Sequence, residues 1–417
     1  MCLLLMQATV INYMDRMALN QMALEIKTTF QLNDTMYSWL ESVFSLAFAI
    51  GALTTGYVVD RVSVRWVYPL MVLGWSAAGV LTGFASTFWM LLLCRFMLGL
   101  FEAGNWPCAL RTTRTVLPPA ERSFGNSLFG SGTALGAVIT PMLVLAILKW
   151  AEANGEVDTW RIPFRMIGSL GLVWVALWFL TVPNRMLNPT DATGAPPAHQ
   201  GATRFTEVFR DRRFWVLLVM ALCVNFTWHG YRTWLPLYLR VERGYSLQQM
   251  SEFTTAYYLL ADVGTWTAGL LTLYLFRRGM PLHRSRVLMF VCCSMLTVMT
   301  VAVPFLPGGW PLQAGLLVVA FGALGLFPTY FALSQELSSK HQGKVTGTLG
   351  ASAHLSLAIL YPVEGWICDV TKSYELVLGG VGLFPLLALG VLLWLWPPWS
   401  ESHPVASQPD SRPAPSA

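Results

Sequence analysis

The chain has 417 residues, of which 55% are hydrophobic, 13% aromatic and only 12% charged, with a formal net charge of +5. Soluble domains carry about 25% charged residues, so this composition and a mean hydropathy of +0.52 exclude an ordinary soluble protein and predict a membrane protein. The seven cysteines show no metal-ligand spacing, and we expect no metal, no cofactor and no disulfide framework.

Twelve segments are long and apolar enough for membrane-spanning helices, which need about 20 residues each. In chain order they are 3–25, 38–60, 67–85, 88–110, 124–149, 162–182, 213–239, 252–276, 285–306, 311–333, 345–367 and 375–397. The longest polar interruption follows the sixth segment. We therefore predict an all-α polytopic fold with a six-helix half at 1–182, a linker loop at 183–212, a second six-helix half at 213–397 and a disordered tail at 398–417.

Basic residues predict the orientation, because Lys and Arg concentrate in cytoplasmic loops. An inside N-terminus places in the cytoplasm the loops that contain Arg61 and Arg65, Arg111, Arg114 and Arg122, Arg204 to Arg213, Arg277 to Arg286, and Lys340 and Lys344. The opposite ends hold fewer, so we expect both termini, the linker and the tail in the cytoplasm. The positive charge is then a topology signal and not a sign of nucleic-acid binding. No cleavable signal peptide is expected at Met1, and a start further upstream is left open.

Charged residues near the middle of the first and fourth predicted spans form two acid–base pairs. Asp15 and Arg16 lie near the middle of the first span and Glu102 near the middle of the fourth, since each helical residue rises about 1.5 Å. Arg95 precedes Glu102 by two turns on the same face. Charges at this depth are costly and persist mostly where they face a cavity or a partner. We therefore expect these acid–base pairs to meet in the first half, with a purely structural network as the alternative.

The chemistry of these groups suggests separate roles. A carboxyl group in a low dielectric keeps its proton to higher pH, whereas the planar guanidinium binds a carboxylate with two hydrogen bonds. We assign Asp15 and Glu102 to proton coupling, Arg95 to tuning or pairing with Glu102, and Arg16 to the carboxylate of a substrate. Asn12 and Tyr13, at the same depth, are candidates for binding substrate hydroxyls, although Tyr13 could serve packing instead.

The second half supplies polar and aromatic residues. The seventh span reads "NFTWHGYRTWLP" and contains Trp228 to stack on a sugar face, Tyr231, and Arg232 to meet an anion from outside. Tyr257 from the eighth span and His354 from the eleventh complete the expected wall. Alternatives remain open: aromatic residues also gather at membrane surfaces, Arg232 could pair with Asp262 as a structural lock, and His354 could simply donate a hydrogen bond.

Several motifs carry a family resemblance. "GALTTG" at 51–56 and "GTWTAG" at 264–269 occupy matching spans of the two halves, as parallel repeats would, or by chance. "GYVVDRVSVRW" resembles the loop between spans two and three of the major facilitator superfamily, in which Gly56, Asp60, Arg61 and Arg65 would form a gating latch. "RFMLGLFEAGNWP" at 95–107 resembles the anion:cation symporter family. "SGTALGAVITP" at 131–141 and "YYLLADVGTWTAGLL" from 257 extend the likeness, most of all to its hexuronate transporters, over about residues 5–397.

The resemblance implies a carrier that imports a sugar acid together with protons, such as the hexuronates glucuronate or galacturonate, across a bacterial inner membrane. It implies that the matching acids are proton sites and that the arginine of the first span binds the anion. Two positions depart from related sugar-acid carriers: Thr133 stands where many have Gln, and Phe48 where some have Tyr. Both leave the exact substrate open.

We expect a monomer whose partners are the anionic substrate, protons and the lipid bilayer. Export of an organic anion is an alternative, and a receptor that binds a sugar acid without transport is another. An enzyme is not expected, because no H-E-x-x-H, G-x-S-x-G or cofactor motif is found.

Overall fold

Helices make up the architecture of the computed structural model, which describes residues 1–59, 61–118, 122–183, 205–337 and 342–396. In the first half these are α1 (Cys2–Gln21), α2 (Ala23–Phe30), α3 (Asp34–Val59), α4 (Val64–Thr82), α5 (Phe88–Glu102), α6 (Asn105–Val116), α7 (Arg122–Ala153) and α8 (Arg161–Thr181). In the second they are η3 (Phe205–Arg210), α9 (Arg212–Leu237), η4 (Tyr238–Glu242), α10 (Leu247–Arg277), α11 (Leu282–Thr297), η5 (Val298–Val301), η6 (Val303–Phe305), α12 (Trp310–Gly325), α13 (Phe327–Glu336), α14 (Gln342–Thr371) and α15 (Glu375–Leu395).

Three predicted spans are each built from two helices. The first span is divided into α1 and α2 at Met22, the fourth into α5 and α6 directly after Glu102, and the tenth into α12 and α13 at Leu326. Local sequence signals start other helices: the Thr87 hydroxyl accepts a hydrogen bond from the Met90 amide at the start of α5, and Ser246 and Gln249 form a capping box at the start of α10. Helices α5 and α10 thus begin where side chains satisfy their free amide groups.

Ten helical segments of the described chain are long and apolar enough to cross a membrane. They match ten of the predicted spans, and those outside this set are the first and the eleventh, which correspond to α1 and α14. Both helices carry buried polar groups, Asn12, Asp15 and Arg16 on α1 and Glu364 on α14, which lower their mean hydropathy. The count of twelve spans stays a prediction.

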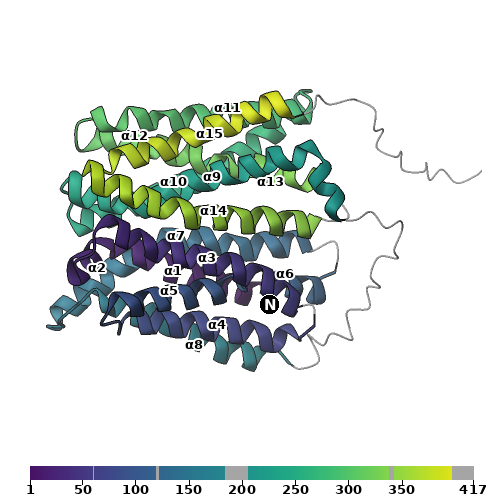
Figure 1. The fold of residues 1–417 in the computed structure, drawn as a ribbon. Helices are drawn as coiled ribbons and strands as arrows, with labels where there is room; N and C mark the ends of the chain where they lie inside the picture. Colours follow the sequence, from purple (N-terminus) through teal and green to yellow (C-terminus); the bar gives the residue numbers. More distant parts are fainter. Residues whose placement is uncertain (60, 119–121, 184–204, 338–341, 397–417) are drawn as a thin grey trace, which may run out of the picture.

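The helices lie alongside one another in two bundles, α1 to α8 and α9 to α15 (Figure 1). The bundles meet where α3 packs on α14 and α7 packs on α10. Most of the predicted linker and all of the predicted tail, residues 184–204 and 398–417, lie outside the described residues. The domain boundaries and the cytoplasmic position of the termini therefore remain predictions.

The repeated glycine motifs occupy matching places in the two bundles. A Cβ atom added to Gly51 on α3 would collide with the backbone carbonyl of Leu100 on α5. A Cβ atom added to Gly264 on α10 would collide with the backbone carbonyl of Phe321 on α12. At the second glycine of each motif, Gly56 and Gly269, it would meet nothing within 4 Å. Helix α3 packs on α5 as α10 packs on α12. Each first glycine therefore allows a close backbone approach of the kind that small residues give membrane helices.

Replacing Gly264 with alanine is expected to destabilise the folded protein by about 1–3 kcal/mol, the usual cost of overpacking, because α10 and α12 must separate to admit the methyl group. The matched variant Gly269→Ala, five residues along the same helix in open space, is expected to unfold like the parent protein. Thermal unfolding of both variants in detergent measures the difference. Equal unfolding temperatures for the two would contradict the packing argument.

One end of the molecule, where α2 lies in Figure 1 and away from the N-terminus, is held shut between the bundles. We call it the closed end and define it by Glu25, Asp34, Gln248, Asp369 and Tyr374. The contacts that cross here are Arg240 to Glu25 at 3.0 Å, Lys149 to Gln248 at 3.0 Å, Tyr374 to Asp34 at 2.9 Å, and the Asp369 carboxylate to the backbone amides of Asp34 and Thr35 at 2.9 Å each. By the predicted orientation, the closed end faces outside.

Candidate functional site

A cluster of six buried charged side chains lies where the bundles meet. We call it the central cluster; its members are Asp15 and Arg16 (α1), Glu41 (α3), Arg95 and Glu102 (α5) and Arg232 (α9). Arg16 donates to Glu102 Oε2 from Nη2 at 2.8 Å and from Nε at 3.1 Å. Arg16 lies deep in the molecule on α1, and only 5% of the residue is exposed. The expected meeting of spans one and four is therefore present, as a buried ion pair.

Asp15 differs from the other acids of the central cluster because it has no cation in direct contact. Both carboxyl oxygens are buried and have no hydrogen-bond partner among the described residues. The side chain fills space left by Gly79 on α4, where a Cβ atom would lie 2.9 Å from Oδ1. A buried carboxylate without partners costs far more than the neutral acid in the same place. The surroundings of Asp15 therefore favour the protonated acid.

Aromatic rings surround the Arg16 guanidinium. Its Cζ lies 5.2 Å from the ring centre of Tyr13, 4.9 Å from that of Phe44 and 5.0 Å from that of Phe48. Phe48 in turn packs on His354 of α14, with ring centres 4.2 Å apart. Cation–π contacts of this kind hold a guanidinium without neutralising it, so Arg16 keeps its capacity to bind an anion.

His354 also faces a second histidine. Its ring centre lies 5.7 Å from that of His229 on α9, and the Nδ1 atoms of both rings are buried without a hydrogen-bond partner in the described chain. His229 is close in sequence to the predicted Trp228, yet we did not predict it as a site residue. The chain of contacts from Arg16 through Phe48 to this histidine pair joins the two halves.

Arg95 and Arg232 have a partner that the sequence analysis missed. We expected Arg95 to tune or pair with Glu102, and considered Asp262 for Arg232. Instead both guanidiniums meet Glu41: Arg232 Nη2 lies 2.9 Å and Arg95 Nη2 3.4 Å from its Oε2. The expected direct pairings are therefore wrong, and for Arg95 the physical reason is that Arg16 already occupies Glu102 Oε2. That Arg95 tunes Glu102 stays a prediction. The signal for Glu41 was present, because it is an acid inside the predicted span 38–60, two turns into helix α3.

The remaining predicted substrate residues lie in different surroundings. Asn12 is buried and its Nδ2 has no partner among the described residues, whereas the half-buried Thr133 donates its hydroxyl to the Gly130 carbonyl of its own helix at 2.9 Å. Trp228 packs edge-on against Tyr258. Tyr231 stacks on Tyr257 and bonds to Thr300, and both tyrosines belong to an apolar core. The structure thus does not bring Tyr231 and Tyr257 to the central cluster.

The predicted gating residues contact their own bundle. Arg61 donates to the Tyr57 carbonyl at 3.2 Å and lies over the Tyr57 ring. Arg65 lies beside the rings of Trp66 and Phe179, and a Cβ atom at Gly56 would meet nothing within 4 Å. Asp60, the acid of this motif, lies outside the described residues. Among the described residues, contacts between the halves are found at the closed end and between Glu41 and Arg232.

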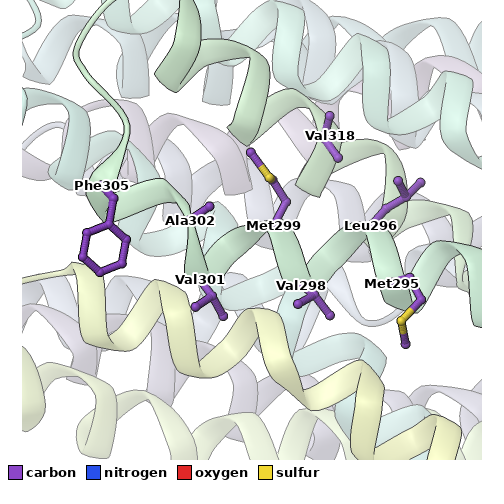
Figure 2. A pocket seen from close by; sticks show the side chains of 8 residues that line it. All are labelled: Met295, Leu296, Val298, Met299, Val301, Ala302, Phe305 and Val318. Atoms are coloured by element: carbon purple, nitrogen blue, oxygen red, sulfur yellow. The ribbon is translucent and has the colours of Figure 1, made fainter.

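A pocket of about 560 Å³ lies away from the charges, between α11, η5 and α12 (Figure 2). Its lining is entirely apolar and includes Met295, Met299 and Phe305. These side chains offer no hydrogen-bond donor for an anion, and Met295 and Phe305 belong to the exposed apolar surface. The pocket therefore suits a lipid tail better than a charged substrate.

Comparison with known proteins agrees with this architecture. The sequence matches the Major Facilitator Superfamily over residues 5–347. The chain belongs to this superfamily. It is a multi-pass membrane protein of a transporter family, and its resemblance to the sugar-acid branch is confirmed by the relatives that follow.

The relatives are bacterial transporters of small organic acids. The chain is 27% identical to a probable sulfoacetate transporter of Cupriavidus necator, with 92% of this chain and 91% of that protein covered. It is 24% identical to the hexuronate transporter of Escherichia coli K12, with 98% and 95% covered. It is 26% identical to a probable L-galactonate transporter of the same organism, with 90% and 84% covered.

A solved structure supports the fold. The crystal structure of a bacterial homolog of the human lysosomal transporter Spinster, in an inward-facing and occupied conformation, superimposes with a TM-score of 0.78. The match covers 95% of this chain and 98% of the other, at 17% sequence identity. At this identity the similarity establishes the major facilitator fold alone.

Proposed function

We propose that this protein is a secondary transporter that imports a sugar acid, most simply a hexuronate such as glucuronate or galacturonate, together with protons. The observation that carries the proposal is the contrast between neighbours on α1: Arg16 is held by Glu102 and three rings, while Asp15 is buried without a partner. An anion anchor thus stands beside a carboxyl group that favours a proton. The hexuronate and galactonate transporters among the relatives support this substrate class.

The charges of the central cluster suggest how proton and anion binding are coupled. Three guanidiniums face three carboxylates, so the cluster is neutral when all three carboxylates are ionised. A proton on Asp15 leaves one net positive charge, which favours the binding of one monovalent anion. Loss of that proton restores neutrality and weakens anion binding. Transport of a monovalent sugar acid with one proton therefore needs no uncompensated charge in the membrane.

Residues of both halves are available for the substrate. Arg16 binds the carboxylate, with Glu102 releasing part of the guanidinium on protonation. Asn12 and Tyr13 bind hydroxyls from one side, and His354 and Trp228 face them from the other half. Rocking of the two bundles around this midplane site would expose it to either side in turn. We place the protein in the inner membrane of a bacterium, as its relatives are bacterial.

Uptake of radiolabelled glucuronate and galacturonate into proteoliposomes tests the proposal. Uptake is expected to exceed passive equilibration when the outside is more acidic, and to fall to that level when an ionophore removes the proton gradient. Unlabelled gluconate, galactonate and sulfoacetate serve as competitors, the last because of the relative from Cupriavidus necator. Competition by sulfoacetate alone would replace the hexuronate by a sulfonated acid, and efflux driven by an inward gradient would favour an exporter.

A further inference from the structure

Glu41 joins the two halves of the molecule through a single oxygen atom. It belongs to α3 of the first half and is fully buried. Its Oε2 accepts a hydrogen bond from Arg232 of the second half at 2.9 Å, and Arg95 of the first half lies 3.4 Å from the same atom. The link between Glu41 and Arg232 is therefore an ion pair that crosses between the bundles with both side chains buried.

The position of this ion pair ties it to the closed end. Arg232 Nη2 also lies 3.3 Å from the Tyr361 hydroxyl of α14, and its carbonyl accepts from Asn20 of α1 at 2.8 Å. Directly beyond, Trp234 packs edge-on against Tyr37, one turn before Glu41 on α3. Separation of the bundles at the closed end moves α9 away from α1 and α3. The contact between Glu41 and Arg232 must then break.

An ionised Glu41 opposes that separation. Breaking the ion pair would leave Arg232 without a carboxylate in a low dielectric, which is strongly unfavourable for a buried charge. A proton on Glu41 removes the attraction. Its Oε1 is buried and has no hydrogen-bond partner among the described residues, so this oxygen is the one available to the proton, and the loss of charge then weakens the ion pair at Oε2. Nε and Nη1 of Arg232 are likewise without partners there.

We propose that Glu41 is a further proton-accepting residue of the transport cycle, whose protonation releases Arg232 and allows the bundles to part at the closed end. As the closed end begins to part, water at that end reaches Glu41 and supplies the proton, which binds Oε1 and frees the guanidinium of Arg232 to meet an incoming anion. When the end closes again, Glu41 gives the proton back to that water and re-forms the ion pair. This inference rests on the proposed function only in assuming that the bundles move relative to each other.

Other groups around Glu41 do not replace it in this role. The titratable and charged residues that face it from its own helix and from its neighbours are Tyr37 (α3), Arg95 (α5), Arg232 (α9), Tyr258 (α10) and Tyr361 (α14). Tyrosine and arginine do not change charge between neutral and mildly acidic pH. Glu41 is the carboxyl group among them, so replacing Glu41 tests whether it carries a response in that range.

The test measures the width of the closed end directly. Spin labels are attached to cysteines at Glu156, in the loop before α8, and at Glu252 on α10, both exposed and on opposite bundles. Cys2 and Cys292, which are not buried, are first replaced by serine. In lipid nanodiscs, the parent is expected to show a longer-distance population that grows several-fold from neutral to mildly acidic buffer. Glu41→Gln, which mimics the protonated acid, is expected to show the longer-distance population in both the neutral and the acidic buffer.

Glu375→Gln is the matched control, because Glu375 forms its ion pair with Arg243 inside the second half; it is expected to respond to pH like the parent. Should Glu41→Gln fail to fold, Glu41→Asp, which keeps the acid but shortens its reach, is expected to widen the closed end in neutral buffer. A parent that does not respond to pH, or a folded Glu41 variant that responds as the parent does, would overturn the proposal. Since no substrate is added, failure of sugar-acid uptake would leave this test unaffected.

Discussion

Arg16→Lys is expected to lower kcat/KM for sugar-acid uptake by about 100-fold, and Arg16→Ala to abolish uptake. Loss of a buried charged hydrogen-bond partner costs about 2–5 kcal/mol in binding, and lysine keeps the charge but not the two-pronged geometry that binds a carboxylate. Initial uptake rates in proteoliposomes over a range of substrate concentrations give the values. Substrate binding to the purified variants, measured by calorimetry, separates lost affinity from lost movement.

The control for Arg16 is Arg210→Ala, which removes an exposed guanidinium at the end of η3 and is expected to leave uptake unchanged. Arg16→Ala also leaves Glu102 without its ion-pair partner, so its folding is checked by thermal unfolding, with Arg16→Ala/Glu102→Gln as a companion that removes both charges. Uptake at the parent's rate by folded Arg16→Ala would show that the anion binds elsewhere.

Asp15→Asn is expected to lose proton-driven accumulation while keeping exchange of labelled for unlabelled substrate. Asparagine imitates the neutral acid, so Arg16 still binds the anion and the bundles still move, but no proton is carried. Each coupled proton can support about tenfold accumulation of substrate per unit of pH difference. The variant is expected to show no accumulation above passive equilibration. Uptake with an imposed gradient and counterflow without one measure the two activities.

Asp262→Asn serves as the matched control, since Asp262 is a half-buried acid on α10 outside the central cluster; it is expected to accumulate substrate normally. Glu102→Gln is expected to impair accumulation as well, with weaker exchange because Arg16 loses its ion-pair partner. If both Asp15→Asn and Glu102→Gln accumulated substrate as the parent does, the coupling assignment would be wrong.

Much of the architecture is predictable because the membrane limits the choices: apolar segments of the right length must be helices. The division of a predicted span into two helices is less predictable. The breaks at Met22 and after Glu102 fall inside segments that read as one span by length and hydropathy, and they depend on packing between helices. Composition also makes α1 and α14 harder to recognise as membrane spans, because their buried polar residues lower the hydropathy by which a span is found.

Members of the central cluster were predictable where a charge stands out against an apolar background, as for Asp15, Arg16 and Glu102. The ion-pair partners of these charges were not predictable, because an ion pair between two helices depends on how each helix is rotated and tilted. Glu41 on α3 reaches both Arg95 and Arg232, and no spacing in the sequence connects these positions. Tyr231 and Tyr257 show the converse: they are polar aromatic residues in a promising span, yet they stack on each other in the interior of the second half.

The contacts that hold the closed end shut have a kinetic consequence. An empty carrier must break the Arg240 to Glu25 ion pair and the bonds of Asp369 to α3 before it can collect another substrate from that side. A carrier that returns loaded has binding energy from the substrate to offset part of this barrier. Net uptake should therefore be limited by the return of the empty protein, and substrate inside the vesicles should accelerate the entry of labelled substrate.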